Sequence, residues 1–461
     1  MSDEQTPPRR LLLTLTALGF AAGGWALFLW WQLLRARAGF EPVCLGGAGG
    51  CGALWDGAMA SWVQAKTGLP VAAWGLVWGI AAAALPLRAL SRDDSSASGV
   101  SWTAASGLVG VFLLLGVSAQ AGQFCGSCAV TYVVTGLYAA LALRGFGLPA
   151  AGAGLATFAI TCGLAWLVLL YPGLRTPTNL GDAGRAALQA GAAEPAAGAE
   201  AGGHDHHDHE HPPIVIPEVR DDHPLRISTW PLAPDEQDLK LRTFLTGLDP
   251  RLQQAMAARL AEHRASPVYA VAPPRDLHGP ADASTRIVDF TDTLCGHCAQ
   301  LFVDLTFLSR LFPPQALSVD SRHFPLDGHC NASMPIQGPE QVRCFAARAR
   351  ICFEGRPAKQ DFEIALYENQ HGLTREQIYA AAAPHLDAAA LDACADSPET
   401  AQKLASDVAD AARYQPQGTP LVLVGGRKSS SLGPLLYAMI LAGGDADHPA
   451  FGVLPAPPAA G

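Results

Sequence analysis

Residues 286–298 read Arg-Ile-Val-Asp-Phe-Thr-Asp-Thr-Leu-Cys-Gly-His-Cys, and a helical pattern continues to about residue 311. The first five residues have the pattern of a short buried strand. A Cys-x-x-Cys pair between a strand and a helix places its first thiol, Cys295, at the helix N-terminus, where the helix dipole and free N–H groups favour the thiolate. A protonated His297 would favour it further. The stretch therefore predicts that Cys295 and Cys298 form a reactive dithiol.

An α/β pattern extends on both sides of this motif, beginning at about residue 267. Downstream, Gly418-Thr419-Pro420 leads into an apolar strand that ends in a Gly-Gly turn. The elements expected after the motif are a strand at 316–325, a helical region at 331–412, a strand at 421–424 and an amphipathic segment at 431–443.

This pattern resembles the thioredoxin fold in its DsbA-like form, which carries a helical insertion between its two halves. The resemblance covers about residues 267–445, in a domain that we place at 267–448 with the insertion at about 331–412. It implies a cis peptide bond before Pro420 and a loop, containing Thr419, that faces the Cys295–Cys298 pair. The Cys-Gly-His-Cys form is itself similar to that of protein disulfide isomerase, which also implies thiol–disulfide exchange.

The insertion holds four further cysteines, which allow three different pairings. They are Cys330, Cys344, Cys352 and Cys394. We favour structural bridges between 330 and 344 and between 352 and 394. By chain closure, each would stabilise the insertion by a few kcal/mol.

Charge is distributed very unevenly along the 461 residues. Residues 1–175 hold 9 of the 31 Lys and Arg and 6 of the 41 Asp and Glu, a net charge of +3, whereas residues 176–461 carry a net charge of −13. A soluble domain is normally about 25% charged, so the first part is too apolar to be one. The acidic remainder argues against a nucleic-acid partner, which would require a basic face.

The first 175 residues contain uncharged runs long enough to cross a lipid bilayer, which takes about 20 apolar residues per helix. The expected spans are 11–34, 70–88, 100–122, 127–143 and 152–172. The first run could instead be a signal peptide, but it is longer than the roughly 7–15-residue apolar core of such signals. The sequence thus predicts a multi-domain protein, with an all-α membrane bundle of five transmembrane helices at 1–175 and an α/β thioredoxin-like domain after it.

An odd number of spans places ten of the eleven cysteines on one side of the membrane, with Cys162 inside the last span. The Lys and Arg residues that flank the spans do not determine the orientation, because five fall on one side of the membrane and four on the other. Ten thiols on one face suit an oxidising compartment such as the periplasm. Two Cys-x-x-Cys pairs could instead bind zinc, but their places, at the start of a membrane helix and between a strand and a helix, favour a relay of dithiols.

Over residues 11–172 the chain resembles the vitamin K epoxide reductase family, in its bacterial form fused to a thioredoxin-like domain. Cys125 and Cys128 match the active-site pair at the start of the family's fourth helix, and the resemblance makes Cys128 the attacking thiol. Cys44 and Cys51 match the loop pair that passes electrons from the partner domain. Positions that resemble residues of the family's quinone pocket are Ser61, Phe124 and Tyr132. The alternative is that these are a helix-cap hydroxyl and ordinary interfacial aromatics.

Between the two domains, residues 176–225 form an Ala-, Gly- and Pro-rich stretch that we expect to be a disordered linker, followed by a short helical connector at 226–266. The linker contains a histidine tract: His204, His206, His207, His209 and His211. Such a tract can bind Zn, Cu or Ni weakly. We interpret it as part of a solvated linker and expect the chemistry to require no metal.

Together these features predict a thiol oxidoreductase of the bacterial inner membrane with its thioredoxin-like domain in the periplasm. Electrons would pass from thiols of periplasmic proteins through Cys295–Cys298, Cys44–Cys51 and Cys125–Cys128 to a membrane quinone, either ubiquinone or menaquinone. Two alternatives remain open. Electrons could flow outward for disulfide reduction or isomerisation, or the protein could be a membrane metal-binding protein that uses the histidine tract.

Overall fold

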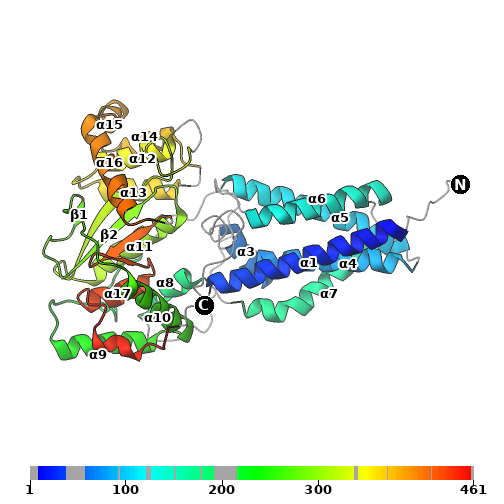
Figure 1. Ribbon diagram of the computed structural model, residues 1–461, viewed down its shortest axis with the longest axis horizontal. Coiled ribbons are helices and arrows are strands. Elements are labelled where there is room, and N and C mark those ends of the chain that lie inside the picture. The colour runs from blue at the N-terminus through cyan, green and yellow to red at the C-terminus, as the bar shows by residue number, and fades with distance from the viewer. Residues whose placement is uncertain are drawn as a thin grey trace. The chain divides into compact units, whose positions relative to one another are not determined.

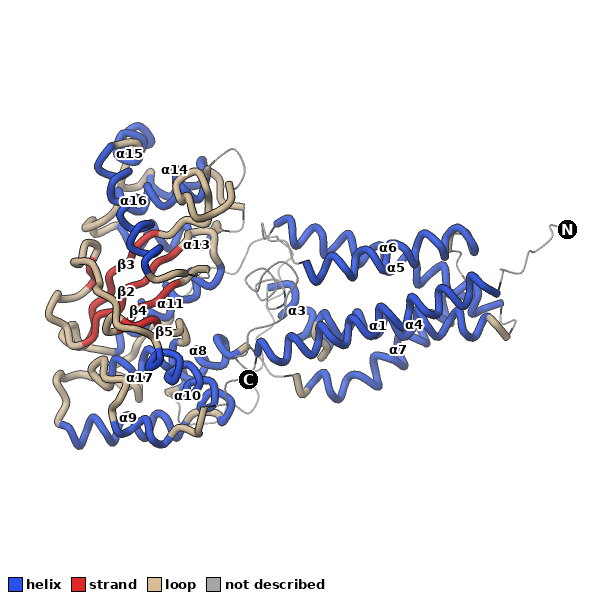
Figure 2. Tube along the Cα trace, in the orientation of Figure 1, coloured by secondary structure: helices blue, strands red, loops and turns tan. Residues whose placement is uncertain are grey.

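The computed structural model describes residues 9–37, 55, 58–91, 94–120, 126–149, 152–176, 179–191, 214, 216–336, 341–370, 372–416 and 418–457. The chain divides into two compact units, Met1–Asn179 and Leu180–Gly461 (Figure 1). Over the described residues, the first unit is helical, and the second combines helices with a sheet (Figure 2).

The first unit is built from helices over its described residues. These are α1 (Arg9–Arg37), α3 (Ala58–Thr67), α4 (Val71–Ala89), α5 (Asp94–Gln120), α6 (Gly126–Phe146) and α7 (Ala153–Leu174). In the described part of the chain, five helices are long and apolar enough to cross a membrane, by length and composition only. They coincide with the five runs expected from the sequence. The 10-residue helix α3 has no predicted counterpart, because it is short and mixes polar with apolar side chains.

Helices α1 and α4 approach each other closely because glycines lie at their contact. A Cβ atom on Gly19 would lie 2.4 Å from backbone atoms of Ala82 and Ala83, and one on Gly79 would lie 2.6 Å from the backbone of Gly23. Any larger side chain at these positions would push the two helices apart, since packed interiors leave no spare volume.

The second unit is organised around a mixed sheet with the strand order β1-β3-β2-β4-β5 over its described residues. The strands are β1 (Leu277–His278), β2 (Thr285–Thr291), β3 (Leu317–His323), β4 (Leu421–Val424) and β5 (Arg427–Ser429). β2 pairs with β3 in parallel and with β4 in antiparallel register, so it lies at the centre. β2, β3 and β4 correspond to the three predicted strands. β1 and β5 have no predicted counterpart because two or three residues are too few to give a periodic signal.

Both faces of β2 are buried, which explains its nearly continuous apolar sequence. Ile287 belongs to a core that includes α11 (Gly296–Leu311) and α17 (Gly433–Leu441). Val288 and Phe290 point to the opposite core.

The core around Ile287 also includes apolar side chains from α9 (Pro234–Gly247) and α10 (Pro250–Ala265). The segment expected as a connector at 226–266 is therefore helical, and it packs into the core of the second unit. The short 3-10 helix η1 (Pro449–Val453) adds Phe451 to the same core.

The helical insertion follows β3 and agrees with the helical region expected at 331–412. Its helices are α12 (Val342–Cys352), α13 (Lys359–Glu368), α14 (Arg375–Ala382), α15 (Ala388–Ala395) and α16 (Pro398–Arg413). It has a core of its own that contains Phe345, Phe353 and Phe362. Disulfides join Cys330 to Cys344 and Cys352 to Cys394, which is the pairing that we favoured from the sequence.

Helix α8 (Leu180–Ala190) lies where the sequence predicted a disordered linker. Its Leu188 is 1% exposed and joins the core around Ile287. Its Arg185 Nε lies 3.5 Å from Asp304 Oδ1 of α11. The linker prediction is wrong for these residues, because the alanine-rich composition conceals an amphipathic helix whose apolar side chains are buried.

Candidate active site

The Cys295–Cys298 pair lies where the central strand passes into a helix. β2 ends at Thr291, and Cys295 is the N-cap residue of α11. The N–H groups of Cys298 and Ala299 donate to the carbonyl oxygen of Cys295 at 2.9 and 3.2 Å, so the motif forms the first turn of the helix. Cys295 is 8% exposed and Cys298 is fully buried. Only the first thiol is therefore placed to meet another protein.

The loop that contains Pro420 lies against the first thiol, as the sequence led us to expect. The Thr419–Pro420 peptide bond is cis, and the Cys295 Sγ donates to the carbonyl oxygen of Thr419 at 3.3 Å. A hydrogen bond from Cys298, with further contributions from His297 and Thr419, lowers the pKa of Cys295 well below its usual value despite burial. Beside the loop, a hollow of about 310 Å³ is lined by residues that include Gly418, Thr419 and Pro420.

The second thiol has the opposite electrostatics. Burial, followed by its interaction with Cys295, raises the pKa of Cys298 well above the usual value. Cys298 packs with Ala299 and Tyr367, and Phe302 and Ile214 lie against this cluster. The pair thus combines a thiolate-forming cysteine near the surface with a buried partner that can resolve a mixed disulfide.

Two buried carboxyl groups, one on the central strand and one in the turn before Cys295, were missed by the sequence analysis. Asp289 of β2 accepts a hydrogen bond from Ser321 Oγ at 3.0 Å, and burial raises its pKa to about 7. Asp292 lies in the turn before Cys295 and is 2% exposed. The only available signal was an acidic residue inside or beside an apolar strand, which does not reveal what the carboxylate will contact.

In the first unit, the structure describes part of the expected quinone-reducing site. Cys128 and Tyr132 lie one turn apart on α6 and are both half-buried, whereas Ser61 lies on α3 and is exposed. The indole Nε1 of Trp25 on α1 donates to the carbonyl oxygen of Ser127 at 3.1 Å. This bond ties the start of α6, which carries Cys128, to α1.

Several predicted site residues lie outside the described residues. They are Cys44, Cys51, Phe124, Cys125 and the five histidines of the tract. In the part of the chain that the structure does describe, no group of three or more His, Cys, Asp or Glu side chains is arranged to hold a metal ion.

The strand, the Cys-x-x-Cys helix, the cis-proline loop and the helical insertion form one arrangement, and residues 286–435 match the DSBA-like thioredoxin domain. This part of the chain is a DsbA-like thioredoxin domain. Such domains are thiol–disulfide oxidoreductases, and Cys295–Cys298 falls inside the matched range.

The chain is also similar to several solved structures. They include a thioredoxin-like oxidoreductase from Silicibacter pomeroyi DSS-3 (20% sequence identity, TM-score 0.26, covering 33% of this chain and 81% of that one), α-DsbA1 from Wolbachia pipientis (17%, 0.25, 33% and 76%) and reduced DsbA1 from Neisseria meningitidis (18%, 0.28, 38% and 89%). No curated protein matches the chain.

Proposed function

We propose that the protein is a membrane thiol oxidase that makes disulfides in periplasmic proteins and passes the electrons to a membrane quinone. The observation that carries the proposal is the asymmetry of the Cys295–Cys298 pair in the DsbA-like domain, with a lowered pKa at the slightly exposed Cys295 and a raised pKa at the fully buried Cys298. The same chain holds, among its described residues, five helices long and apolar enough to cross a membrane. In this proposal those helices span the bacterial inner membrane and the DsbA-like domain lies in the periplasm.

The cycle begins with Cys295 and Cys298 joined as a disulfide. A substrate thiolate attacks Cys295 Sγ, the bond to Cys298 breaks, and Cys298 leaves and takes up a proton. A second substrate thiolate then displaces Cys295, so the substrate loses two electrons and the pair gains them. The low pKa of Cys295 helps this step, because a thiol with a lower pKa leaves faster.

Two further exchanges would carry the electrons onward. In the first, the Cys44–Cys51 disulfide takes two electrons from the reduced pair and returns Cys295–Cys298 to the disulfide; in the second, the Cys125–Cys128 disulfide takes them from Cys44 and Cys51. A quinone at the start of α6 is supported by the position of Tyr132 one turn from Cys128 and by the Trp25 indole that bonds to Ser127, because quinones are bound beside aromatic and hydroxyl groups. A quinone bound there supplies a two-electron, two-proton acceptor.

The test is quinone reduction by the full-length protein in detergent, with a reduced dithiol peptide as the electron donor. We expect quinone absorbance to fall with wild-type protein and with Cys162→Ser, and to stay constant with Cys128→Ser. Quinone reduction by Cys128→Ser would contradict the relay. Net reduction of peptide disulfides by added quinol would favour the outward direction, and loss of activity on deleting residues 204–211 would favour the metal-binding alternative.

A further inference from the structure

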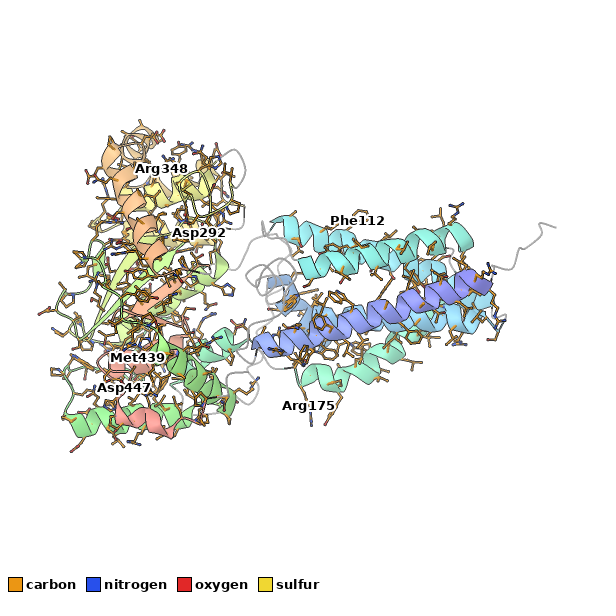
Figure 3. All side chains as sticks on the ribbon, viewed as in Figure 1. Phe112, Arg175, Asp292, Arg348, Met439 and Asp447 are labelled. Atoms are coloured by element: carbon orange, nitrogen blue, oxygen red, sulfur yellow. A yellow bond between two sulfur atoms is a disulfide. The ribbon has the colours of Figure 1, made fainter. Side chains whose placement is uncertain are left out.

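Asp292 connects three segments of the DsbA-like domain immediately before the reactive cysteine (Asp292 is labelled in Figure 3). Its Oδ1 accepts from the N–H of Leu294 at 2.7 Å, and its Oδ2 accepts from the N–H of Leu326 at 2.7 Å. Its carbonyl oxygen accepts from the N–H of Cys295 at 3.1 Å. The guanidinium of Arg343, from the first turn of α12, completes the set by donating to Oδ1.

The charges in this cluster oppose each other. A carboxylate beside Cys295 disfavours the thiolate, and burial followed by Cys295 itself raises the pKa of Asp292, whereas Arg343 lowers it. Each carboxylate oxygen of Asp292 accepts a hydrogen bond from a main-chain N–H group, of Leu294 or of Leu326, and these bonds favour the ionised carboxylate. A buried carboxylate of this kind needs a paired cation, and Arg343 supplies it.

The position of Arg343 is itself fixed. It precedes Cys344, whose disulfide to Cys330 ties the start of α12 to the loop after β3. The Arg343 side chain is 14% exposed and the Asp292 side chain is fully buried. The ion pair is therefore held in a part of the domain where it interacts more strongly than an exposed pair.

We propose that Arg343 is a positioning residue for the reactive thiolate: by pairing with Asp292, it removes the repulsion that the Asp292 carboxylate would exert on Cys295. The inference rests on the proposed role of Cys295 as the cysteine that exchanges with substrate and leaves as a thiolate. Arg343 acts through Asp292 and does not itself meet the substrate. The groups that face the Asp292 carboxylate and the Cys295 thiolate are Arg343, His297, Cys298 and the Thr419 loop.

The test is the pH dependence of Cys295 alkylation by iodoacetamide in the reduced full-length protein, followed at the Cys295 peptide by mass spectrometry. We expect Arg343→Met to raise the pKa of Cys295 by about one unit, which is a tenfold decrease in its acid dissociation constant. Adding Asp292→Asn to Arg343→Met should restore it, and Arg343→Lys, which keeps the charge, should largely preserve it. The matched control is Arg348→Met, which removes another arginine of α12 (labelled in Figure 3). Arg348 pairs with Asp396 at 3.6 Å.

Each outcome has a distinct meaning. The inference is overturned if the Cys295 titration is unchanged in Arg343→Met while this variant has the same melting temperature as Arg348→Met. A shifted titration that Asp292→Asn fails to restore also overturns it, because Arg343 would then act on the thiolate directly. If Cys295 is not alkylated faster than Cys298 in the wild-type protein, the proposed function fails at its first step and the inference fails with it.

Discussion

Replacing Asp289 by Asn should change how the stability of the DsbA-like domain depends on pH. Asp289 lies on the central strand, accepts a hydrogen bond from Ser321, and is buried, which raises its pKa from 3.8 to about 7. Asparagine has the same shape and keeps an oxygen for Ser321, but it carries no charge. The substitution therefore removes the titration and leaves the packing nearly unchanged.

The magnitude follows from proton linkage. Between about pH 4 and pH 7 the folded domain keeps a proton on Asp289 that the unfolded chain releases, so stability is greatest below this window and falls as the pH rises through it. One pKa unit corresponds to about 1.36 kcal/mol, and a shift of roughly three units gives about 4 kcal/mol in total. About 3 kcal/mol of this should be lost between about pH 4.5 and pH 8.

The assay is urea unfolding of a fragment comprising the second unit, from Leu180 onward, across this pH range. The measured quantity is the free energy of unfolding of Asp289→Asn minus that of the wild type, since other titrating groups contribute equally to both. We expect this difference to rise by about 3 kcal/mol in favour of Asn from low to high pH. Asp235→Asn, at an exposed position of α9, should give a flat difference. A flat difference for Asp289→Asn as well would refute the reasoning.

Two further predictions concern the packing of the second unit. Removing the Cys352–Cys394 bridge should destabilise the domain by about 4 kcal/mol and removing Cys330–Cys344 by about 3 kcal/mol. The bridged residues are 42 and 14 positions apart, and closure entropy grows with loop length. Urea unfolding of the two double-alanine variants should show this order, and the reverse order would contradict it. Gly184→Val should weaken the packing of α8 by roughly 1–3 kcal/mol, because a Cβ at Gly184 would lie 2.8 Å from the Pro434 ring. Amide exchange over residues 180–190 should be faster than in the control Ala186→Val, which changes an exposed position of the same helix. Equal protection in the two variants would contradict the prediction and show that the ring can move aside.

The sequence predicts the parts of this fold that depend on local pattern. The strand before Cys295, the helix after it and the loop at Pro420 each give a continuous signal of five or more residues or a specific motif. The five long apolar helices of the first unit are equally readable, because long uncharged runs have few alternatives, whereas the short α3 is not. Local signals of this kind were sufficient to place the reactive pair at the end of β2.

The surroundings of the pair depend on contacts between distant segments, which a single sequence does not contain. Asp292 and Arg343 are 51 residues apart, and the loop that carries Leu326 is 34 residues from Asp292. Nothing in the spacing indicates that these residues meet. Helix α8 was missed for a different reason: its apolar positions are mostly alanine, so composition indicated a linker although Leu188 and Ala183 pack against the core.

The docking of α8 changes the meaning of the histidine tract. Helix α8 and Ile214 both pack within the second unit, so the histidine tract lies between two points of the chain that belong to the same unit. The tract is then not part of the sequence that joins the two units. Its last histidine is three residues from Ile214, at most about 10 Å of extended chain from a side chain that packs on the cysteine cluster. Any ion that the tract binds would stay attached to the unit that carries the Cys295–Cys298 pair. Changing the length of the tract would leave the length of chain that joins the two units unaltered.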